Sequence, residues 1–237
     1  MKINNRILLW QLIVIGLILI LIVSCKKDNY NPPYMTDHDG NVYTSVTIGT
    51  QVWMVENLKT TKYNDGTAIP LVTDPLDWQG LLTHGYCWYV NDEAEYKATY
   101  GALYNWYVVD SASNGGKNVC PTGWHVPSDV EWTTLTKYSG GEYIAGGKLK
   151  ETGTIHWFAP NTDANNASGF TALPGGTRNG IGEFVNVHIC GYWWSSTKST
   201  KYSVQCAYYR DMDYSVSSVT ISYRDKKDGS SVRCLRD

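Results

Sequence analysis

Phenylalanine, the aromatic residue that needs no hydrogen-bond partner when buried, is scarce in this 237-residue chain. The chain has three Phe against 18 Tyr and 10 Trp. A buried Tyr or Trp must find a partner for its hydroxyl or its indole N–H, so the composition favours half-buried positions with an apolar body and a polar tip. Small β-rich secreted domains and saccharide-binding surfaces share this composition, and composition alone does not choose between them.

Runs of basic residues and closely spaced cysteines are also missing. The 20 Lys and Arg residues are balanced by 22 Asp and Glu, for a formal net charge of −2. Nucleic acid therefore has no electrostatic footprint on this chain. No two cysteines lie two to four residues apart, and the five His residues do not cluster with them. A zinc site is therefore not expected, and neither is any cofactor apart from the calcium considered below.

Long apolar runs are absent except at the start of the chain. Lys2 and Arg6 precede an apolar run from Ile7 to Val23, the pattern of an export signal. The run ends in Leu-Ile-Val-Ser before Cys25, which resembles the bacterial lipobox, where a diacylglycerol is attached to the thiol before cleavage. We expect residues 1–24 to be the signal peptide and Cys25 the lipidation site. The alternative is an uncleaved single-pass helix, since about 18 apolar residues can just span a bilayer.

The residues after the lipobox indicate a location. An aspartate after the cysteine is typical of inner-membrane retention, whereas Lys26 stands there and resembles the outer-membrane class. Residues 25–35 are polar and rich in proline and asparagine, a short tether with no apolar face. Acyl chains would hold the protein on the membrane at about 0.8 kcal/mol per buried CH₂. We therefore expect an outer-membrane lipoprotein facing the periplasm or the outside, with residues 36–237 as one domain.

The pattern of the remaining chain predicts strands at both ends with helices between them. Residues 36–58 favour strand, turn and strand, and residues 231–236 a final strand. Ser128 with Glu131 forms a capping box before a helix of about ten residues. A second short helix is expected over 144–150, and a short helix over 100–109. This order argues for an α+β domain whose terminal strands come together.

Blocks spread over nearly the whole mature chain resemble the Fibrobacter succinogenes major paralogous domain family of secreted bacterial lipoproteins. In order they read DGNVY (39–43), WMVENLK (53–59), YNDG (63–66), YGALYNWY (100–107), CPTGWHVPS (120–128), GKLKE (147–151), GFTALPGG (169–176), GYWWSST (191–197) and SVRC (231–234).

The resemblance implies a C-type-lectin-like fold, with two short helices packed on small twisted antiparallel sheets and the terminal strands paired. The stretch from Trp124 to Trp132 is also similar to a block of formylglycine-generating enzymes, which share that fold. Those enzymes use a closely spaced cysteine pair near the C-terminus to bind copper, and Cys190, Cys206 and Cys234 are far apart. This spacing disfavours a formylglycine-generating reaction. The family has no settled activity, so the resemblance implies a fold and a location, and the chain is not expected to be an enzyme.

Five cysteines remain after Cys25, and the compartment permits disulfides. Cys190 and Cys206 look like additions to the family pattern, which favours a bridge between them that closes about 15 residues and contributes about 3 kcal/mol. A second bridge is expected between Cys120 and Cys234, with Cys87 left as a buried thiol. The pairings of Cys87 with Cys234 or with Cys120 stay open, because three cysteines allow three pairings.

Two other clusters could hold chemistry, and for each the simpler interpretation is preferred. His125 and Glu131 could form a general acid–base pair, but the cap already occupies Glu131. The stretch 37–41 resembles the start of a calcium loop yet lacks the closing glutamate, so a hairpin turn is expected. Four oxygen-bearing side chains between 161 and 166 leave a weak possibility of calcium, since only one is a carboxylate: Asn161, Asp163, Asn165 and Asn166.

Ligand recognition is the function that remains. Trp78 and Trp157 lie in polar, loop-like surroundings where an indole face could stack on a sugar ring. The other seven Trp residues of the mature chain fall on predicted elements and are expected in the core. The hypothesis is a non-catalytic binding domain for a glycan or a cell-surface protein. The alternative is a structural or assembly component of the envelope whose aromatic residues are all core.

Overall fold

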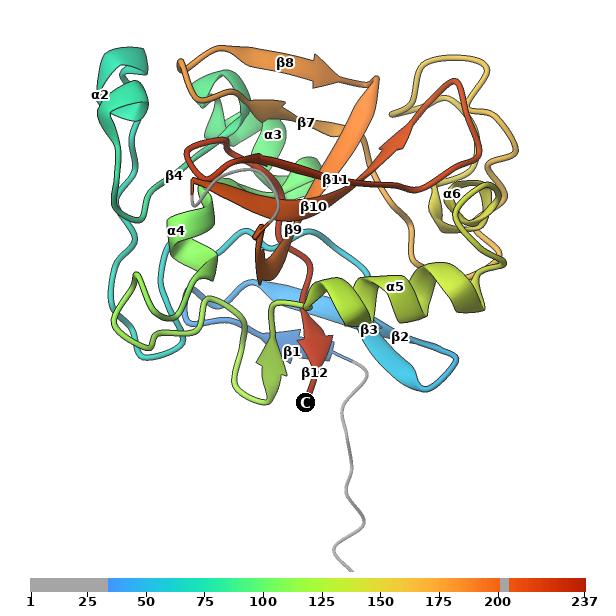
Figure 1. The fold of residues 1–237 in the computed structure, drawn as a ribbon, viewed down its shortest axis with the longest axis horizontal. Coiled ribbons are helices and arrows are strands. Elements are labelled where there is room, and N and C mark those ends of the chain that lie inside the picture. Colours follow the sequence, from blue (N-terminus) through green and yellow to red (C-terminus); the bar gives the residue numbers. More distant parts are fainter. Residues whose placement is uncertain (1–33, 201–204) are drawn as a thin grey trace, which may run out of the picture. The chain divides into compact units, whose positions relative to one another are not determined.

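The computed structural model describes residues 34–200 and 205–237. The predicted signal peptide, Cys25 and nearly all of the tether 25–35 lie outside the described residues. The part of the chain that is described contains no helix with the length and apolar character needed to cross a membrane. Its secondary structure is mostly strand with a few short helices (Figure 1), which agrees with the expected α+β class.

The first sheet brings together the N-terminal hairpin and the C-terminal strand. Its strand order is β1-β2-β3-β12-β6. The last strand pairs antiparallel with β3, where Leu235 lies opposite Trp53. The first and last strands therefore lie in one sheet, as expected, but they do not pair with each other. Strand β1 pairs only with β2, and β12 pairs with β3 instead. The strands are β1 (Tyr34–Thr36), β2 (Val42–Ile48), β3 (Gln51–Met54), β6 (Trp124–His125) and β12 (Leu235–Arg236).

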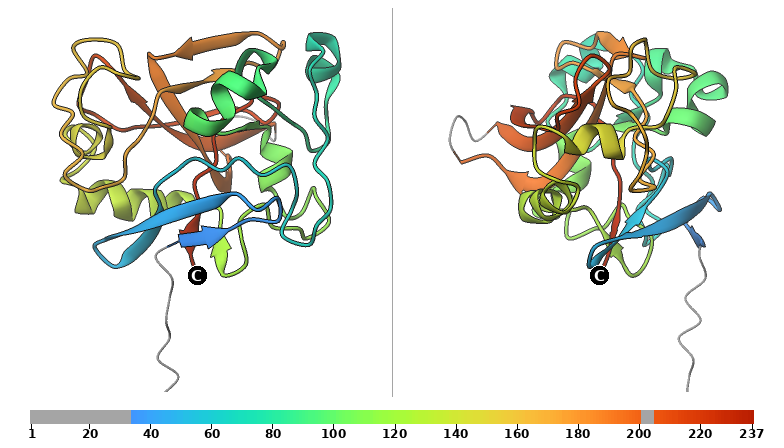
Figure 2. Two further views of the ribbon diagram at one scale, coloured as in Figure 1. Left: turned by 180° about the vertical axis from the view of Figure 1, so that it is seen from behind. Right: turned by 90° about the vertical axis from the view of Figure 1, so that its right-hand side faces the viewer.

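The second sheet is built around a long hairpin and has the order β11-β10-β9-β7-β8. All its pairings are antiparallel except the one between β7 and β9. Figure 2 shows the C-terminal segment running from this sheet to the first, and residues 229–231 form bridges to Arg178, Tyr104 and Trp193 on the way. The strands are β7 (Gly175–Arg178), β8 (Phe184–Val187), β9 (Cys190–Lys198), β10 (Cys206–Asp213) and β11 (Thr220–Asp225); a small separate sheet pairs β4 (Tyr86–Cys87) with β5 (Leu103–Tyr104).

Short helices surround the sheets, and two of them confirm the sequence prediction. Ser128 caps α5: its Oγ accepts from the Glu131 backbone N–H, and Glu131 Oε2 accepts from the Ser128 N–H at 2.7 Å. The second expected helix, over 144–150, is α6. The helices are α2 (Pro75–Gly80), η1 (Tyr89–Asn91), α3 (Glu93–Tyr100), α4 (Trp106–Val109), α5 (Asp129–Tyr138) and α6 (Ala145–Leu149).

The single helix expected over 100–109 is wrong. Helix α3 ends at Tyr100 because Gly101 adopts φ +76°, a conformation that glycine accepts readily and that stops the helix. The chain then forms β5, since Ala102 N–H donates to the Leu58 carbonyl and Leu103 pairs with Cys87. The single turn of α4 follows this strand.

Every tryptophan of the described chain is buried, and most find the polar partner that composition anticipates. The indole N–H of Trp106 donates to the Ser195 carbonyl at 2.8 Å, and that of Trp194 to the Tyr104 carbonyl at 2.7 Å. The core placement predicted for seven of them is confirmed: Trp53, Trp88, Trp106, Trp124, Trp132, Trp193 and Trp194. The core therefore contains polar groups of Tyr and Trp side chains that form hydrogen bonds with the backbone.

The structure settles the cysteines. Cys120 and Cys234 form a disulfide across 114 residues, and Cys87 is a buried free thiol, so both expectations are confirmed. The predicted bridge between Cys190 and Cys206 is wrong, because both are free. In the β9–β10 hairpin Cys190 lies opposite Asp213, whereas the Cys206 carbonyl accepts from Ser199. Nine residues of strand separate the two ends by roughly 30 Å, far beyond the reach of a disulfide.

Candidate functional site

Trp78, predicted to face a ligand, is completely buried. Asp74 accepts from the N–H groups of Leu76 and Asp77 and so starts α2 at Pro75, and the turn that follows directs the indole inward. There the Arg178 guanidinium lies 4.6 Å from the ring centroid. Trp78 is therefore a core residue beside a buried cation, and the ligand-facing prediction for it is wrong.

The ligand-facing prediction for Trp157 is also wrong, and the exposed side chains of this loop are its neighbours. Trp157 is 1 % exposed, and its indole N–H donates to the Ala172 carbonyl at 3.0 Å. The N–H of Phe158 donates to the His188 carbonyl, which ties this bent stretch to the turn after β8. Trp157 is buried, whereas His156 is half-buried and Phe158 is 51 % exposed.

These two residues belong to a row of rings that we call the aromatic strip: Tyr96, Tyr100, His156, Phe158 and His188. Helix α3 supplies Tyr96 and Tyr100 one turn apart, with ring centroids 5.8 Å apart. Tyr100 meets His156 and His188 edge-on at 5.8 Å and 6.0 Å. Phe158 stacks on His188 at 5.6 Å. Three segments far apart in sequence thus form one aromatic surface of which Phe158 is the most exposed member.

The two imidazoles of the strip are oriented by bonds to Nδ1. His156 Nδ1 lies 2.8 Å from a carboxylate oxygen of Glu151, and His188 Nδ1 lies 2.8 Å from the His156 carbonyl. Carbonyl and carboxylate oxygens only accept, so each Nδ1 carries the proton and each neutral ring keeps Nε2 as an acceptor. An Nε2 atom in this tautomer can accept from a hydroxyl donor.

Tyr100 is buried between these rings, and its hydroxyl lies 3.3 Å from His188 Nδ1. Burial, with Tyr96 and Glu151 nearby, raises its pKa to about 12, so the hydroxyl stays protonated at neutral pH. The strip therefore combines ring faces with one hydroxyl and two imidazole acceptors. Such a mixture of apolar faces and a few oriented polar groups is typical of sites for polar organic ligands.

Strained backbone flanks the strip on two sides. His188, in the turn between β8 and β9, and Asn186, within β8, both have φ of +66°. Val90 has φ +44°, a genuine outlier for a β-branched residue, and it lies just before α3. Such residues cost about 1–3 kcal/mol each and cluster at functional sites. The strain is a second reason to place the site here.

The His125 and Glu131 pair is brought together, as a structural clamp. His125 Nε2 lies 3.0 Å from Glu131 Oε1, and Nδ1 lies 2.6 Å from Asp237 Oδ1. The other oxygen of Glu131 caps α5. Burial alone lowers the pKa of His125, but the two carboxylates outweigh it and raise that pKa above its usual value. Both ring nitrogens are engaged, so the imidazole ties β6 to β12 and to the start of α5.

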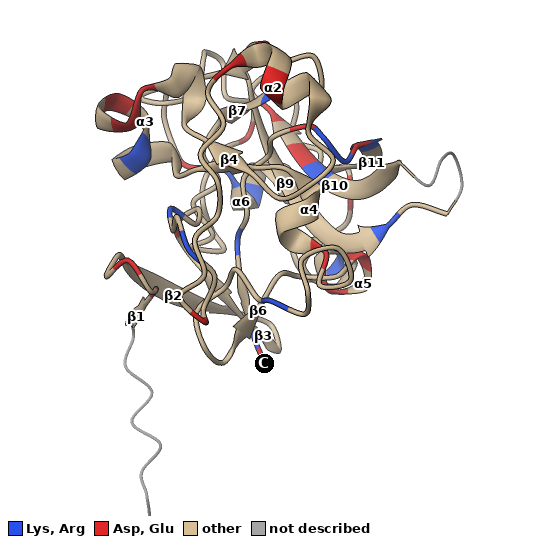
Figure 3. Cartoon of the chain, turned by 90° about the vertical axis from the view of Figure 1, so that its left-hand side faces the viewer, with Lys and Arg blue, Asp and Glu red and all other residues tan. Residues whose placement is uncertain are grey.

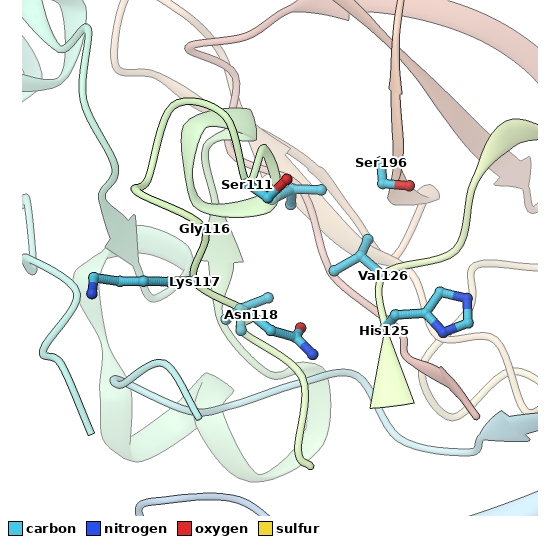
Figure 4. Close-up of a pocket in the computed structure, with 9 residues that line it drawn as sticks. Ser111, Gly116, Lys117, Asn118, His125, Val126 and Ser196 are labelled. Atoms are coloured by element: carbon cyan, nitrogen blue, oxygen red, sulfur yellow. The ribbon is translucent and has the colours of Figure 1, made fainter. Parts of the chain in front are cut away.

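A pocket of about 290 Å³ opens beside this clamp (Figure 4). Figure 4 shows Lys117 and His125 pointing away from each other on opposite sides of it. Lys117 forms an ion pair with Asp65 at 2.9 Å. Three valines line it together with Ser111 and Ser196. Its charged groups are thus already paired.

The oxygens of the two calcium candidates are only partly engaged within the chain, since the buried Asn161 Oδ1 has no hydrogen-bond partner among the described residues. Asp37 accepts from the backbone of Asp39 and Asn41, which confirms the hairpin turn between β1 and β2. Asn161 donates to two backbone carbonyls, and the Asn166 side chain bonds Thr171 through both its amide oxygen and its amide nitrogen. In residues 34–200 and 205–237 no three His, Cys, Asp or Glu side chains converge as a metal site. In Figure 3, acidic and basic segments are interspersed over the side shown.

The sequence therefore pointed to part of the site and missed the rest. It drew attention to the loop at 156–158 but chose the wrong side chain in it. Tyr96, Tyr100 and His188 carried no signal, because only the fold brings α3 and the β8–β9 turn beside this loop.

Comparison with known proteins gives one match. The family model described as the Fibrobacter succinogenes major domain matches residues 46–236, most of the chain. No curated protein and no solved structure matches the chain.

Proposed function

This chain belongs to the Fibrobacter succinogenes major domain family, and on that premise we propose that it is an outer-membrane lipoprotein whose domain binds a saccharide chain without transforming it. The anchor is the diacylglycerol on Cys25, and the binding surface is the aromatic strip. The single observation that carries the binding proposal is the alignment of five rings from three segments, with Phe158 half exposed at the surface.

The chemistry of the strip suits a sugar. The apolar C–H face of a pyranose stacks on an aromatic ring, while its hydroxyls need fixed partners. Phe158 and His188 supply stacked faces, and the oriented imidazoles and Tyr100 supply an acceptor or a donor for hydroxyls. A row of rings also favours a ligand that extends over several units.

The proposed absence of catalysis is supported by the thiols. Burial raises the pKa of Cys87 to about 12, and burial together with Asp213 raises that of Cys190 to about 12. Only the thiolate is a nucleophile and metal ligand, so thiols with such pKa values are inert at neutral pH. Cys190 and Cys206 also lie at opposite ends of their hairpin, unlike the closely spaced pair of formylglycine-generating enzymes.

The proposal includes a C-type-lectin-like arrangement of the domain. It is supported by the sheet shared between the N-terminal hairpin and the C-terminal strand, and by α5 and α6 beside a second, curled sheet. The resemblance to formylglycine-generating enzymes is carried by this arrangement and by the stretch around α5.

The experiment is a binding screen of the purified lipoprotein in detergent against a panel of polysaccharides, with and without EDTA. Phe158→Ala should weaken binding of the best ligand about threefold to tenfold, because an aromatic stacking contact contributes about 0.5–1.5 kcal/mol. Tyr34→Ala is the matched control, because Tyr34 is 52 % exposed and lies on β1 outside the strip. Loss of binding with EDTA would indicate calcium in the site.

A structural role in envelope assembly is the second candidate. Its specific support is a group of exposed apolar side chains around α2, where Leu76 is 74 % and Leu82 63 % exposed. Absence of binding to every polysaccharide, with the folded state intact, would refute the saccharide proposal and favour this one.

A further inference from the structure

A second pocket, of about 310 Å³, shares no residue with the aromatic strip. It lies where the tip of a hairpin, the end of one helix and a second helix meet. The tip of the β2–β3 hairpin supplies Thr47 and Ile48, the end of α5 supplies Tyr138 and Ser139, and α6 supplies Lys148. Ala167 and Ser168 complete the lining. Figures 1 and 2 show the hairpin tip, the end of α5 and α6 on the same side of the domain. We call this the Lys148 pocket.

The pocket holds a half-buried cation that the described residues do not neutralise. Lys97 and Lys117 form ion pairs with Glu93 and Asp65. Lys148 has neither an ion pair nor a hydrogen bond from its Nζ within residues 34–200 and 205–237. Its Nζ lies over the backbone of Gly140, where an added Cβ would come within 3.2 Å. A cation held in a pocket in this way favours an anionic group.

The aromatic ring of Tyr138 forms another side of the pocket. Tyr138 is 66 % exposed, yet its ring is held in place against Gly49. A Cβ at Gly49 would approach Tyr138 Cδ2 to 2.8 Å, and Gly49 has φ +63°, so the contact depends on glycine. The hairpin tip thus positions an exposed aromatic face beside the lysine.

Hydroxyl groups supply the remaining polar contacts. Ser139 is 4 % exposed, and its buried Oγ has no hydrogen-bond partner among the described residues. One χ1 rotation redirects a serine hydroxyl, and a buried hydroxyl without a partner is destabilising. Ser168 Oγ donates to the Lys148 carbonyl at 2.8 Å, which ties the loop at 167–168 to α6.

From this geometry we propose that the Lys148 pocket binds one hexuronic acid unit. The carboxylate pairs with Lys148 Nζ, the apolar face of the pyranose stacks on Tyr138, and the hydroxyls bond Ser139 and Thr47. The site goes beyond the saccharide binding proposed for the aromatic strip and does not depend on it, because no residue is shared.

The test is a titration of the purified lipoprotein, followed by calorimetry, with glucuronate, glucose and inorganic phosphate. Glucuronate should bind at least about tenfold more tightly than glucose, since a hydrogen bond to a charged group is worth that factor or more. Lys148→Met should weaken glucuronate binding by a similar factor. Lys137→Met is the matched control, because Lys137 is exposed in the last turn of α5 and does not line the pocket.

Two further variants separate this proposal from the others. Tyr138→Ala should weaken glucuronate binding, whereas Phe158→Ala should leave it unchanged. Melting temperatures without ligand verify that each variant folds. The proposal is overturned if glucuronate binds no better than glucose, or if Lys148→Met binds like the parent protein. Equal binding of phosphate and glucuronate overturns the sugar assignment, because it would show a site for a bare anion.

Discussion

The disulfide between Cys120 and Cys234 gives the prediction whose magnitude follows most directly from the structure. Both residues are fully buried in the first core cluster, and the bridge closes a loop of 114 residues. Constraining the unfolded chain over such a loop contributes about 5 kcal/mol in the chain-entropy model. The Cys120→Ala/Cys234→Ala variant should therefore lose up to about 5 kcal/mol of unfolding free energy.

Equilibrium unfolding in urea, followed by circular dichroism, measures this loss. With a slope of about 2.5 kcal/mol per molar for a domain of this size, the midpoint should fall by about 2 M. Reductant should shift the parent protein in the same direction and leave the double variant unchanged.

The cysteines that the structure leaves free provide the control. A Cys190→Ala/Cys206→Ala variant should retain the full effect of reductant, because neither thiol is bridged. If reductant does not move the midpoint of the parent protein, the bridge and the loop-closure reasoning are both refuted. If the effect disappears in the Cys190/Cys206 variant instead, the strand register that separates those residues is wrong.

Two further predictions concern the clamp and the anchor. The raised pKa of His125 means that its contribution is present below the unfolded value of about 6.5 and is lost as pH rises through the folded value. His125→Gln should lose no more than about 1 kcal/mol of unfolding free energy at pH 5.5, because solvent screens this partly exposed group. At pH 9 its stability should equal that of the parent protein. An equal difference at both pH values in urea unfolding would contradict the ionic interpretation. Cys25→Ser should lose the diacylglycerol and keep residues 1–24 in its intact mass, because cleavage follows attachment of the lipid to the thiol. A parent protein whose intact mass retains residues 1–24 and a bare thiol would instead support the uncleaved helix.

The loop at 156–158 shows why the candidate site was only partly predictable. Its polar setting correctly marked it as a surface loop, but which side chain faces outward depends on a backbone hydrogen bond to His188, 30 residues away. In the segment that this bond holds, Trp157 lies in the core and Phe158 is left exposed. The indole that looked most suited to stacking is therefore the one that the fold uses as core.

What the sequence by itself determined is local or compositional. The capping box of Ser128 and Glu131 starts α5 through contacts three residues apart, and the turn at 37–41 is closed by its own aspartate. The family blocks identify the domain because many short motifs recur in order. The preference for Tyr and Trp over Phe anticipates a core whose aromatic tips bond the backbone.

Only the tertiary structure decided the features that depend on partners distant in the chain. Cys120 meets Cys234 because β6 and β12 are neighbours in one sheet, and Cys190 cannot meet Cys206 because hairpin register places them at opposite ends. The aromatic strip and the Lys148 pocket each combine three or more segments. The sequence does not predict that these side chains lie close together, because their proximity results from sheet pairing and core packing rather than from any local interaction.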